Sequence, residues 1–225
     1  MNDAESFRTW VEEVNQAGGT YHRMELGAGL VLDGEYDMAR YFGSYGIPDD
    51  LTDRTVLDVG TASGFFAFEC ARRGARVTAI DIHDMELVRR VRDGLGLDVT
   101  VLQKDLFNLD PAFGTFDYVI CASLLLHVRD IVGALERVRS VCQNQAIVCT
   151  GIIDAVDPVC EFVGVQAPGG DGPYWTYWMP SMAALVRMMS AAGFSTVTEI
   201  SRFTLRSAPG KNNFSTPHGV VRGEV

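Results

Sequence analysis

The chain has 225 residues, a formal net charge of −10, 47% apolar residues and 21% charged residues. No segment approaches the run of about 18 apolar residues that crosses a membrane as a helix. The acidic start also lacks the basic and apolar parts of a signal peptide. A nucleic-acid partner is disfavoured as well, because proteins that bind phosphates present a basic face. Five cysteines without a C-x-x-C pair predict buried free thiols, so we expect one cytoplasmic globular domain.

The first 51 residues are predicted to form a leader that packs on a core of residues 52–225. An amphipathic helix opens the leader and ends near Gly18 and Gly19, because its apolar residues are spaced by three and four positions: Phe7, Trp10, Val11 and Val14. His22 follows this helix. If the leader folds over a pocket, His22 is one candidate for a general base.

The segment from Val56 to Phe66 is the most informative part of the chain. It predicts a buried strand that ends in Asp58, a turn of small residues, and a helix from Phe65. The carboxyl edge of a parallel sheet binds nucleotide-like ligands in doubly wound folds. A dinucleotide fingerprint needs G-x-G-x-x-G, and two of its three glycines are missing after Gly60. A carboxylate before the turn repels a pyrophosphate and suits a ligand with an ammonium group.

What stands in this segment is D-x-G-x-x-x-G, from Asp58 to Gly64, with Ala62 between the glycines. It resembles motif I of the class I S-adenosylmethionine-dependent methyltransferases, [DE]-x-G-x-G-x-G, with Ala62 in place of the middle glycine. The resemblance implies S-adenosyl-L-methionine as cofactor, held by the side chains and backbone of Asp58, Gly60, Thr61, Ala62 and Gly64. An ordinary strand–turn–helix, with glycines needed only for geometry, is the alternative.

Acidic residues also follow the next two predicted strands. Asp81 ends the strand 76–81, close to the distance of about 20 residues at which Rossmann-like folds place a ribose-binding carboxylate. The resemblance implies that Asp81 holds the ribose and that Ile82 packs on the adenine. It also implies that Asp105 and Leu106, after the strand 99–102, contact the adenine amino group and a ring nitrogen.

The fourth predicted strand, 116–121, continues through Ser123 to His127. By resemblance, Ser123 belongs to the cofactor site. His127 follows the strand at the carboxyl edge and is the first candidate for a general base, with a core histidine that opens the next helix as the equal alternative. The segment after this strand has no carboxylate for a hard ion, so no metal is predicted.

A helix over 130–141, a strand over 145–151, a helix over 181–192 and a closing hairpin complete the predicted core. Fold class is therefore α/β: a Rossmann-like, seven-stranded mixed sheet with an antiparallel last strand and helices on both faces. The segment 169–180 is rich in glycine and aromatic residues and predicts a lid loop before the last helix. From this loop, Tyr174, Trp175 and Trp178 are candidates for an acceptor pocket, with packing of the loop on the sheet as the alternative.

The leader, the segment Ile47–Leu51 and the aromatic loop together look like the subgroup related to the wobble-uridine tRNA methyltransferases. Relatives in that subgroup also act on sugars, lipids and secondary metabolites. We expect methyl transfer to an oxygen or nitrogen of a small molecule. A tRNA-modifying methyltransferase, a non-catalytic module that binds the cofactor, and an NAD-dependent oxidoreductase are the alternatives. The sequence predicts no membrane partner and leaves open whether the chain forms a homodimer.

Overall fold

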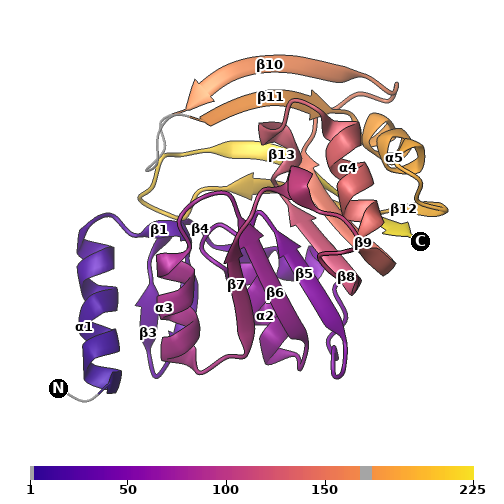
Figure 1. Ribbon diagram of the computed structural model, residues 1–225. Helices are drawn as coiled ribbons and strands as arrows, with labels where there is room; N and C mark the ends of the chain where they lie inside the picture. Colours follow the sequence, from indigo (N-terminus) through magenta and orange to yellow (C-terminus); the bar gives the residue numbers. More distant parts are fainter. Residues whose placement is uncertain (1–2, 168–173) are drawn as a thin grey trace.

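A single mixed sheet of seven strands lies at the centre of the molecule, in the order β12-β13-β9-β8-β5-β6-β7 (Figure 1). The computed structural model describes residues 3–167 and 174–225. Strands β5 to β9 pair in parallel, and β13 lies antiparallel between β9 and β12. The predicted fold class and the antiparallel last strand are confirmed. The bounds are β5 Thr55–Val59, β6 Arg76–Asp81, β7 Val99–Gln103, β8 Phe116–Ala122, β9 Cys142–Gly151, β12 Thr196–Arg206 and β13 Ser215–Glu224.

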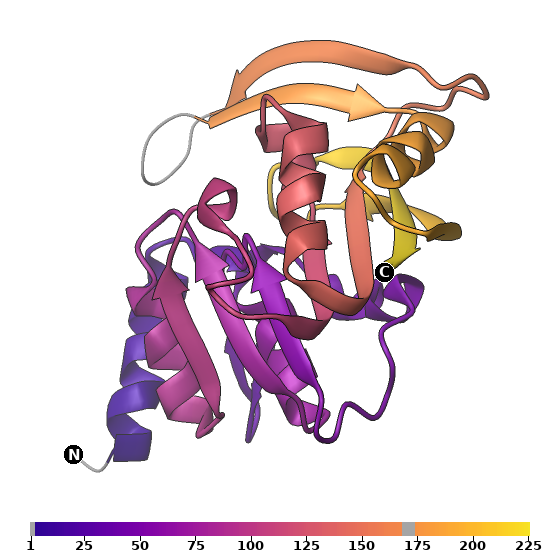
Figure 2. The same cartoon turned by 45° about the vertical axis from the view of Figure 1, so that its right-hand side comes forward.

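Helices cover both faces of this sheet, because strand side chains alternate between two apolar layers. Val56 of β5 packs in the layer of α2 and α3, whereas Leu57 and Val59 pack in the layer of α4 and α5. Figure 2 shows the helices on the two faces of the sheet. Asp58 therefore shares the face that α2 covers. The helices are α2 Phe65–Arg72, α3 Glu86–Leu95, α4 Ile131–Ser140 and α5 Met182–Ala191, with short 3₁₀ turns η3 Leu106–Asn108 and η4 Leu125–His127.

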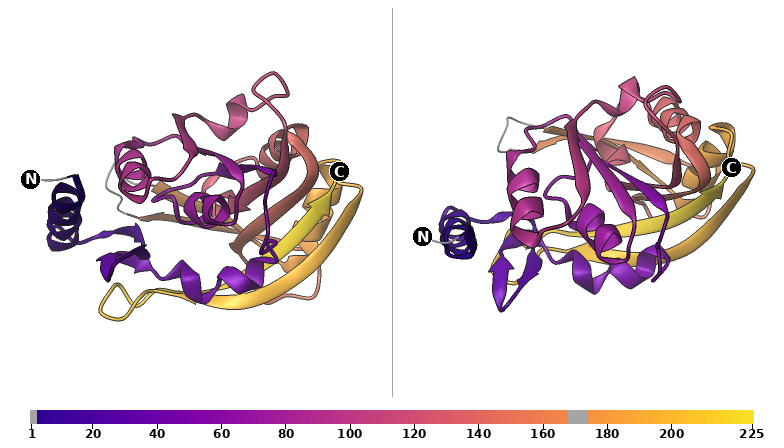
Figure 3. Two further views of the ribbon diagram at one scale, coloured as in Figure 1. Left: turned by 90° about the horizontal axis from the view of Figure 1, so that it is seen from below. Right: turned by 60° about the horizontal axis from the view of Figure 1, so that its bottom comes forward.

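The leader begins with the predicted helix, α1, which lies at one end of the molecule beside α3. There the guanidinium of Arg90 lies 4.7 Å from the centre of the Trp10 ring. The rest of the leader runs along the face of the sheet that carries α2, towards β12 (Figure 3). At β12 the Ser201 hydroxyl donates to the Ser44 carbonyl at 2.6 Å. The division at residue 51 stays a prediction. The leader elements are α1 Asp3–Gln16, β1 Thr20–His22, β2 Met24–Gly27, β3 Leu30–Leu32, β4 Gly34–Tyr36, η1 Met38–Arg40 and η2 Phe42–Tyr45.

A two-stranded antiparallel ribbon, β10 Cys160–Ala167 with β11 Tyr174–Pro180, crosses above the carboxyl ends of the parallel strands. The predicted lid loop is therefore wrong for Tyr174–Pro180, which is a strand. Tyrosine, tryptophan and threonine favour a pleated, half-buried surface, and here β10 supplies the partner strand. The other part of that prediction, residues 169–173, lies outside the described residues.

All five cysteines are free thiols, four of them buried, as the sequence predicts. Within residues 3–167 and 174–225, none of the helices has the length and apolar character needed to cross a membrane.

Packing of α5 on the sheet depends on a glycine in β13. A Cβ at Gly223 would lie 2.6 Å from the Met189 methyl carbon and 2.6 Å from the Phe194 ring. We predict that Gly223→Ala lowers the free energy of unfolding by about 1–3 kcal/mol, the usual cost of overpacking. Urea denaturation measures this loss. Gly43→Ala is the control, since a Cβ there meets nothing within 4 Å; equal stabilities for the two variants would contradict the packing described.

Candidate active site

The loop after β5 is held by the end of β6. The backbone N–H groups of Gly60 and Thr61 both donate to the Ile80 carbonyl, at 2.9 and 3.1 Å. The next N–H, that of Ala62, donates to Asp81 Oδ2 at 3.0 Å. A pyrophosphate site needs loop N–H groups directed at the ligand. Because these three are already bonded to β6, the loop offers little to a dinucleotide.

Four residues around this loop have left-handed backbones, and two of them are not glycines. Gly60 and Gly64 have φ of +73° and +91°, whereas Ala62 and Ser123 have +49° and +56°. A side chain in this region costs of order 1–3 kcal/mol, which explains why the family pattern favours glycine where Ala62 stands. A Cβ at Gly60 would also lie 3.0 Å from the Leu124 side chain. The segment after β8 therefore packs directly against the loop.

Asp58 is buried beneath this loop, with only 1% of its surface exposed. Its Oδ2 accepts from the Thr61 hydroxyl at 2.5 Å and from the Ala67 N–H at 3.1 Å. Burial raises the pKa of Asp58 to about 7, against the opposing effect of these two hydrogen bonds. The Asp58 carboxylate thus lies inside the protein and not open at the sheet edge, because α2 covers this face of β5. Asp58 joins strand, loop and helix, and its contact with an ammonium group stays a prediction.

The predicted ribose and adenine residues lie together at the ends of β6 and β7. Asp81 pairs in register with Gln103, and the Lys104 N–H donates to the Asp81 carbonyl at 2.7 Å. Ile82, beside Asp81, is 57% exposed and offers an apolar surface.

Asp105 and Leu106, the two residues predicted to contact the adenine, lie just after β7. Asp105 caps η3 by accepting from the Phe107 N–H at 2.9 Å. The N–H of Leu106, the first residue of η3, cannot be bonded within this turn. Leu106 has a buried side chain. Its backbone is thus the part that can reach a ligand.

His127 lies in η4, one turn beyond the residue that packs on Gly60. Its N–H donates to the Leu124 carbonyl at 2.9 Å, and its ring Nδ1 lies 2.8 Å from the Trp175 carbonyl oxygen of β11. Burial lowers the pKa of His127, and the bond to Trp175 opposes this shift. The lowered pKa favours the neutral ring, the state that a general base requires.

His22, the other histidine candidate, is placed inside the leader. It is 5% exposed and packs on the rings of Phe65 and Phe66. Burial lowers its pKa to about 3, far from the value that suits a base at neutral pH. His22 thus packs the leader against α2, and its role as a base stays a prediction that this burial disfavours.

Ser63 joins the leader to the loop, a contact that the sequence analysis missed. Its buried hydroxyl oxygen accepts from the backbone N–H groups of Tyr21 and His22, at 3.2 and 3.3 Å. The leader strand β1 thus lies directly over the loop. A serine within a small-residue turn carries no local signal of such a distant partner.

The aromatic residues of β11 divide into two groups. Trp175 is 38% exposed and stacks on Tyr177, with ring centres 6.0 Å apart. Trp178 packs on Phe162 of β10, and its indole N–H donates to the Arg129 carbonyl at 3.0 Å. Trp175 is thus open to a ligand and Trp178 anchors the ribbon. Tyr174, the third predicted acceptor residue, begins β11, and its side chain is outside the described part of the structure.

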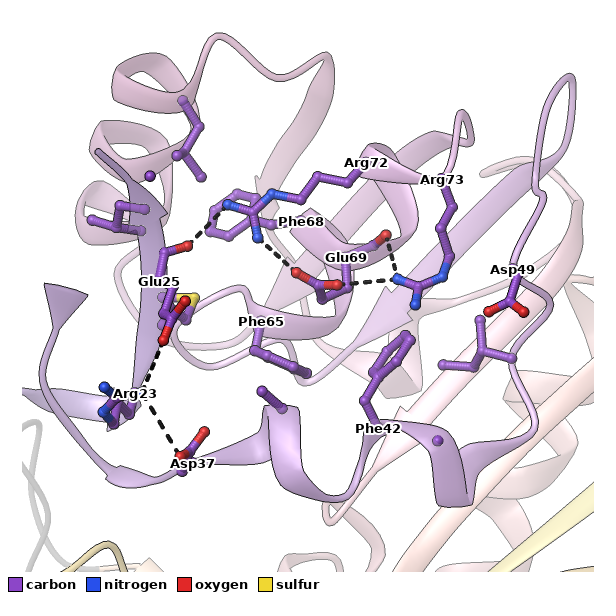
Figure 4. A pocket seen from close by; sticks show the side chains of 17 residues that line it. Arg23, Glu25, Asp37, Phe42, Asp49, Phe65, Phe68, Glu69, Arg72 and Arg73 are labelled. Carbon is purple, nitrogen blue, oxygen red and sulfur yellow. Dashed lines mark hydrogen bonds and ion pairs between the residues drawn. The ribbon is translucent and has the colours of Figure 1, made fainter. Parts of the chain in front are cut away.

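A separate cavity of about 990 Å³ lies between α2 and the leader, away from the sheet edge (Figure 4). Ion pairs line it: Glu69 binds both Arg72 and Arg73, and Arg23 lies 3.7 Å from Asp37. None of the predicted site residues lines this cavity. Its arginines are occupied by neighbouring carboxylates.

Comparisons with known proteins bear on what this edge binds. A family model described as a methyltransferase domain matches residues 56–145, which contain the loop, Asp81, Asp105 and His127. The ubiquinone biosynthesis O-methyltransferase of Methylocella silvestris is 30% identical over 175 residues, which cover 72% of this chain and 68% of that protein. The magnesium-protoporphyrin O-methyltransferase of Rhodobacter capsulatus is 39% identical over 87 residues, 37% of this chain and 38% of that protein.

A solved structure has the same fold over the full chain. The N-terminal domain of EvdMO1, crystallised with SAH bound, superposes with a TM-score of 0.67 at 17% identity. It covers 100% of this chain and 98% of that domain. At this identity the likeness concerns the fold, including the two-layered arrangement of helices around the sheet.

The raised pKa of Asp58 gives a testable pH dependence. Between the ordinary value of 3.8 and about 7, the folded protein binds more protons than the unfolded one. The wild type therefore loses stability as pH rises through this window, by about 1.4 kcal/mol per pH unit at most. Asp58→Asn cannot ionise. We predict that its stability relative to the wild type increases from pH 5 to pH 7 in urea denaturation.

The exposed Asp93, at the end of α3, provides the control variant Asp93→Asn. A stability difference between Asp58→Asn and the wild type that stays constant from pH 5 to pH 7 would contradict the burial of an ionisable carboxyl beneath the loop.

Proposed function

We propose that this chain, which belongs to the class I S-adenosyl-L-methionine-dependent methyltransferase family, methylates an oxygen or nitrogen of a small molecule. Membership of the family rests on the match over residues 56–145 and on the relative that is 30% identical along 68% of its length. The cofactor is S-adenosyl-L-methionine. One observation supports this cofactor independently of the family match. The loop N–H groups of Gly60, Thr61 and Ala62 are bonded to β6 and are therefore not available to the pyrophosphate of a dinucleotide.

The residues at the sheet edge fit such a cofactor. Asp81 offers carboxylate oxygens beside the exposed apolar Ile82, which suits a ribose next to a flat base. Asp105 and the Leu106 N–H are assigned to the edge of the adenine. Ser123 is assigned to the part of the cofactor that lies nearest β8. When bound, S-adenosyl-L-methionine supplies an electrophilic methyl group on a sulfonium. The surrounding residues orient it and exclude water, which can lower the barrier by up to about 7–11 kcal/mol.

His127 is the proposed general base. Its lowered pKa favours the neutral ring, which lies on η4, the turn whose preceding residue Leu124 packs on Gly60. In this role it accepts the proton of an acceptor hydroxyl or ammonium group. Trp175, exposed beside it on β11, is the proposed wall of the acceptor pocket.

The acceptor class rests on the named relatives and on charge. Two of these relatives are named as O-methyltransferases of ubiquinone biosynthesis and of magnesium protoporphyrin, which favours oxygen as the acceptor atom. Neither supports the narrower link to wobble-uridine tRNA enzymes. The net charge of −10 also disfavours a nucleic-acid substrate. We propose no metal requirement, no membrane partner and, from the free thiols, a cytoplasmic setting; a homodimer remains open.

The cofactor assignment predicts the effect of Asp81→Ala. Loss of charge-assisted hydrogen bonds to the ribose should weaken S-adenosyl-L-methionine binding about 10- to 100-fold, as measured by calorimetry. Asp93→Asn, at the exposed end of α3, is the control and should bind like the wild type. Equal affinity of the Asp81 variant and the wild type would remove Asp81 from the cofactor site.

The function is tested by incubating the enzyme with methyl-labelled S-adenosyl-L-methionine and an extract of the source cell, separated into metabolite and tRNA fractions. We expect label in a small molecule, and about 100- to 10,000-fold slower transfer by His127→Gln with unchanged cofactor binding. Label in tRNA would favour the wobble-uridine alternative. Cofactor binding without transfer to either fraction would favour a non-catalytic module.

A further inference from the structure

Three contacts join strand β11 of the ribbon to the segment that carries His127. The Trp175 carbonyl oxygen lies 2.8 Å from His127 Nδ1. The Arg129 side chain donates from Nε to the Tyr177 hydroxyl at 3.2 Å, and its guanidinium lies 5.5 Å from the centre of the same ring. The Trp178 indole N–H donates to the Arg129 carbonyl at 3.0 Å. Contacts of this kind tie β11 to η4, although the ribbon is not part of the main sheet.

The first of these contacts determines where the neutral imidazole carries its proton. A backbone carbonyl oxygen only accepts hydrogen bonds, so Nδ1 of His127 must be the donor. A neutral histidine has one N–H, and the lone pair then stands on Nε2. When Nε2 accepts a proton, the ring becomes cationic and the bond from Nδ1 to the Trp175 carbonyl is strengthened, because its donor is charged.

The other two contacts fix the position of that carbonyl. Trp178 lies three residues beyond Trp175 on the same strand. Its ring also packs on the ring of Phe162 of β10, with ring centres 5.1 Å apart. Tyr177 is held between the Arg129 guanidinium and the Trp175 ring. The strand is thus bonded to Arg129 as well as to His127, and this second attachment, two residues further along the segment, limits movement of the strand along it.

We infer that the β10–β11 ribbon is a positioning element for the base: the Trp175 carbonyl holds His127 in the Nδ1–H tautomer, and Trp178 keeps that carbonyl in place. The inference rests on the proposed function, in which His127 accepts the acceptor's proton. In that step the O–H or N–H bond of the acceptor breaks and the proton binds Nε2. Trp178 is then a positioning residue, which acts on the reaction through His127.

The tautomer can be measured directly by ¹⁵N NMR of protein labelled in its histidines, without substrate or turnover. The resonances of His127 are assigned with His127→Gln, since the chain has four histidines. We expect the wild type at pH 8 to show a protonated Nδ1 and an unprotonated Nε2. A wild-type ring with its proton on Nε2 overturns the inference, whatever the activity.

The role of Trp178 is tested with Trp178→Phe, which removes the indole N–H and keeps an aromatic ring against Phe162. Loss of one hydrogen bond should shift the tautomer ratio of His127 about two- to tenfold towards Nε2–H. The maximal rate of transfer should fall by a similar factor, with unchanged affinity for S-adenosyl-L-methionine. Trp175→Phe is the matched control for the tautomer, because it keeps the backbone carbonyl and alters only the exposed ring.

A folded Trp178→Phe protein with the wild-type tautomer ratio contradicts the positioning role. The result is independent of the proposed function: a wild type with the Nδ1–H tautomer that transfers no methyl group leaves the ribbon's hold on His127 intact and removes the proposed reaction instead.

Discussion

The end of β6 holds the loop that follows β5, and the rest of the site depends on this attachment. The Ile80 carbonyl accepts two loop N–H groups, and the Asp81 carboxylate accepts a third. Beneath the loop, buried Asp58 bonds to Thr61 and to the start of α2. The loop is therefore fixed from two sides. Its left-handed residues can keep a costly backbone conformation because the surrounding bonds leave no alternative.

This attachment determines the kind of ligand that the sheet edge can hold. A loop that directs its N–H groups at a ligand attracts phosphates, whereas this loop uses them within the protein. What remains at the edge is the Asp81 carboxylate, the exposed Ile82 and the turn that begins at Leu106. The leader covers one side of the loop, where its strand β1 is bonded to Ser63. The ribbon covers another side of the site, where Trp175 is bonded to His127. The residues predicted to bind the cofactor and the candidate base thus lie around a single loop.

The positions of Asp81 and Asp105 at the sheet edge were predictable from the sequence because the signals are local, whereas their contacts with the cofactor stay a prediction. Each parallel strand ends in a recognisable residue, and the ends of parallel strands meet at one edge, so Asp81 and Asp105 could be placed without a structure. The burial of Asp58 was not predictable in the same way. A strand pattern shows where a strand ends, but the face that α2 covers follows from the packing of the helix.

The acceptor side was less predictable because it is made of distant pairings. The bonds from the ribbon to His127 and Arg129 span nearly fifty residues, although the pairing of β10 with β11 is itself local. Glycines in that region favoured a loop, whereas residues 174–180 pair with the preceding segment 160–167 as a strand. The bonds from Tyr21 and His22 to Ser63 span about forty residues in the same way. In each case the determining contact is made by backbone or small polar groups that leave no sequence pattern.

A calorimetric comparison of S-adenosyl-L-methionine and NAD on the wild-type protein tests the central claim most directly. The claim is that a loop whose N–H groups are bonded to β6 selects a sulfonium cofactor over a dinucleotide. We expect S-adenosyl-L-methionine to bind at one site per chain and NAD to give no binding heat under the same conditions. Binding of NAD at that site, with none of S-adenosyl-L-methionine, would contradict the account.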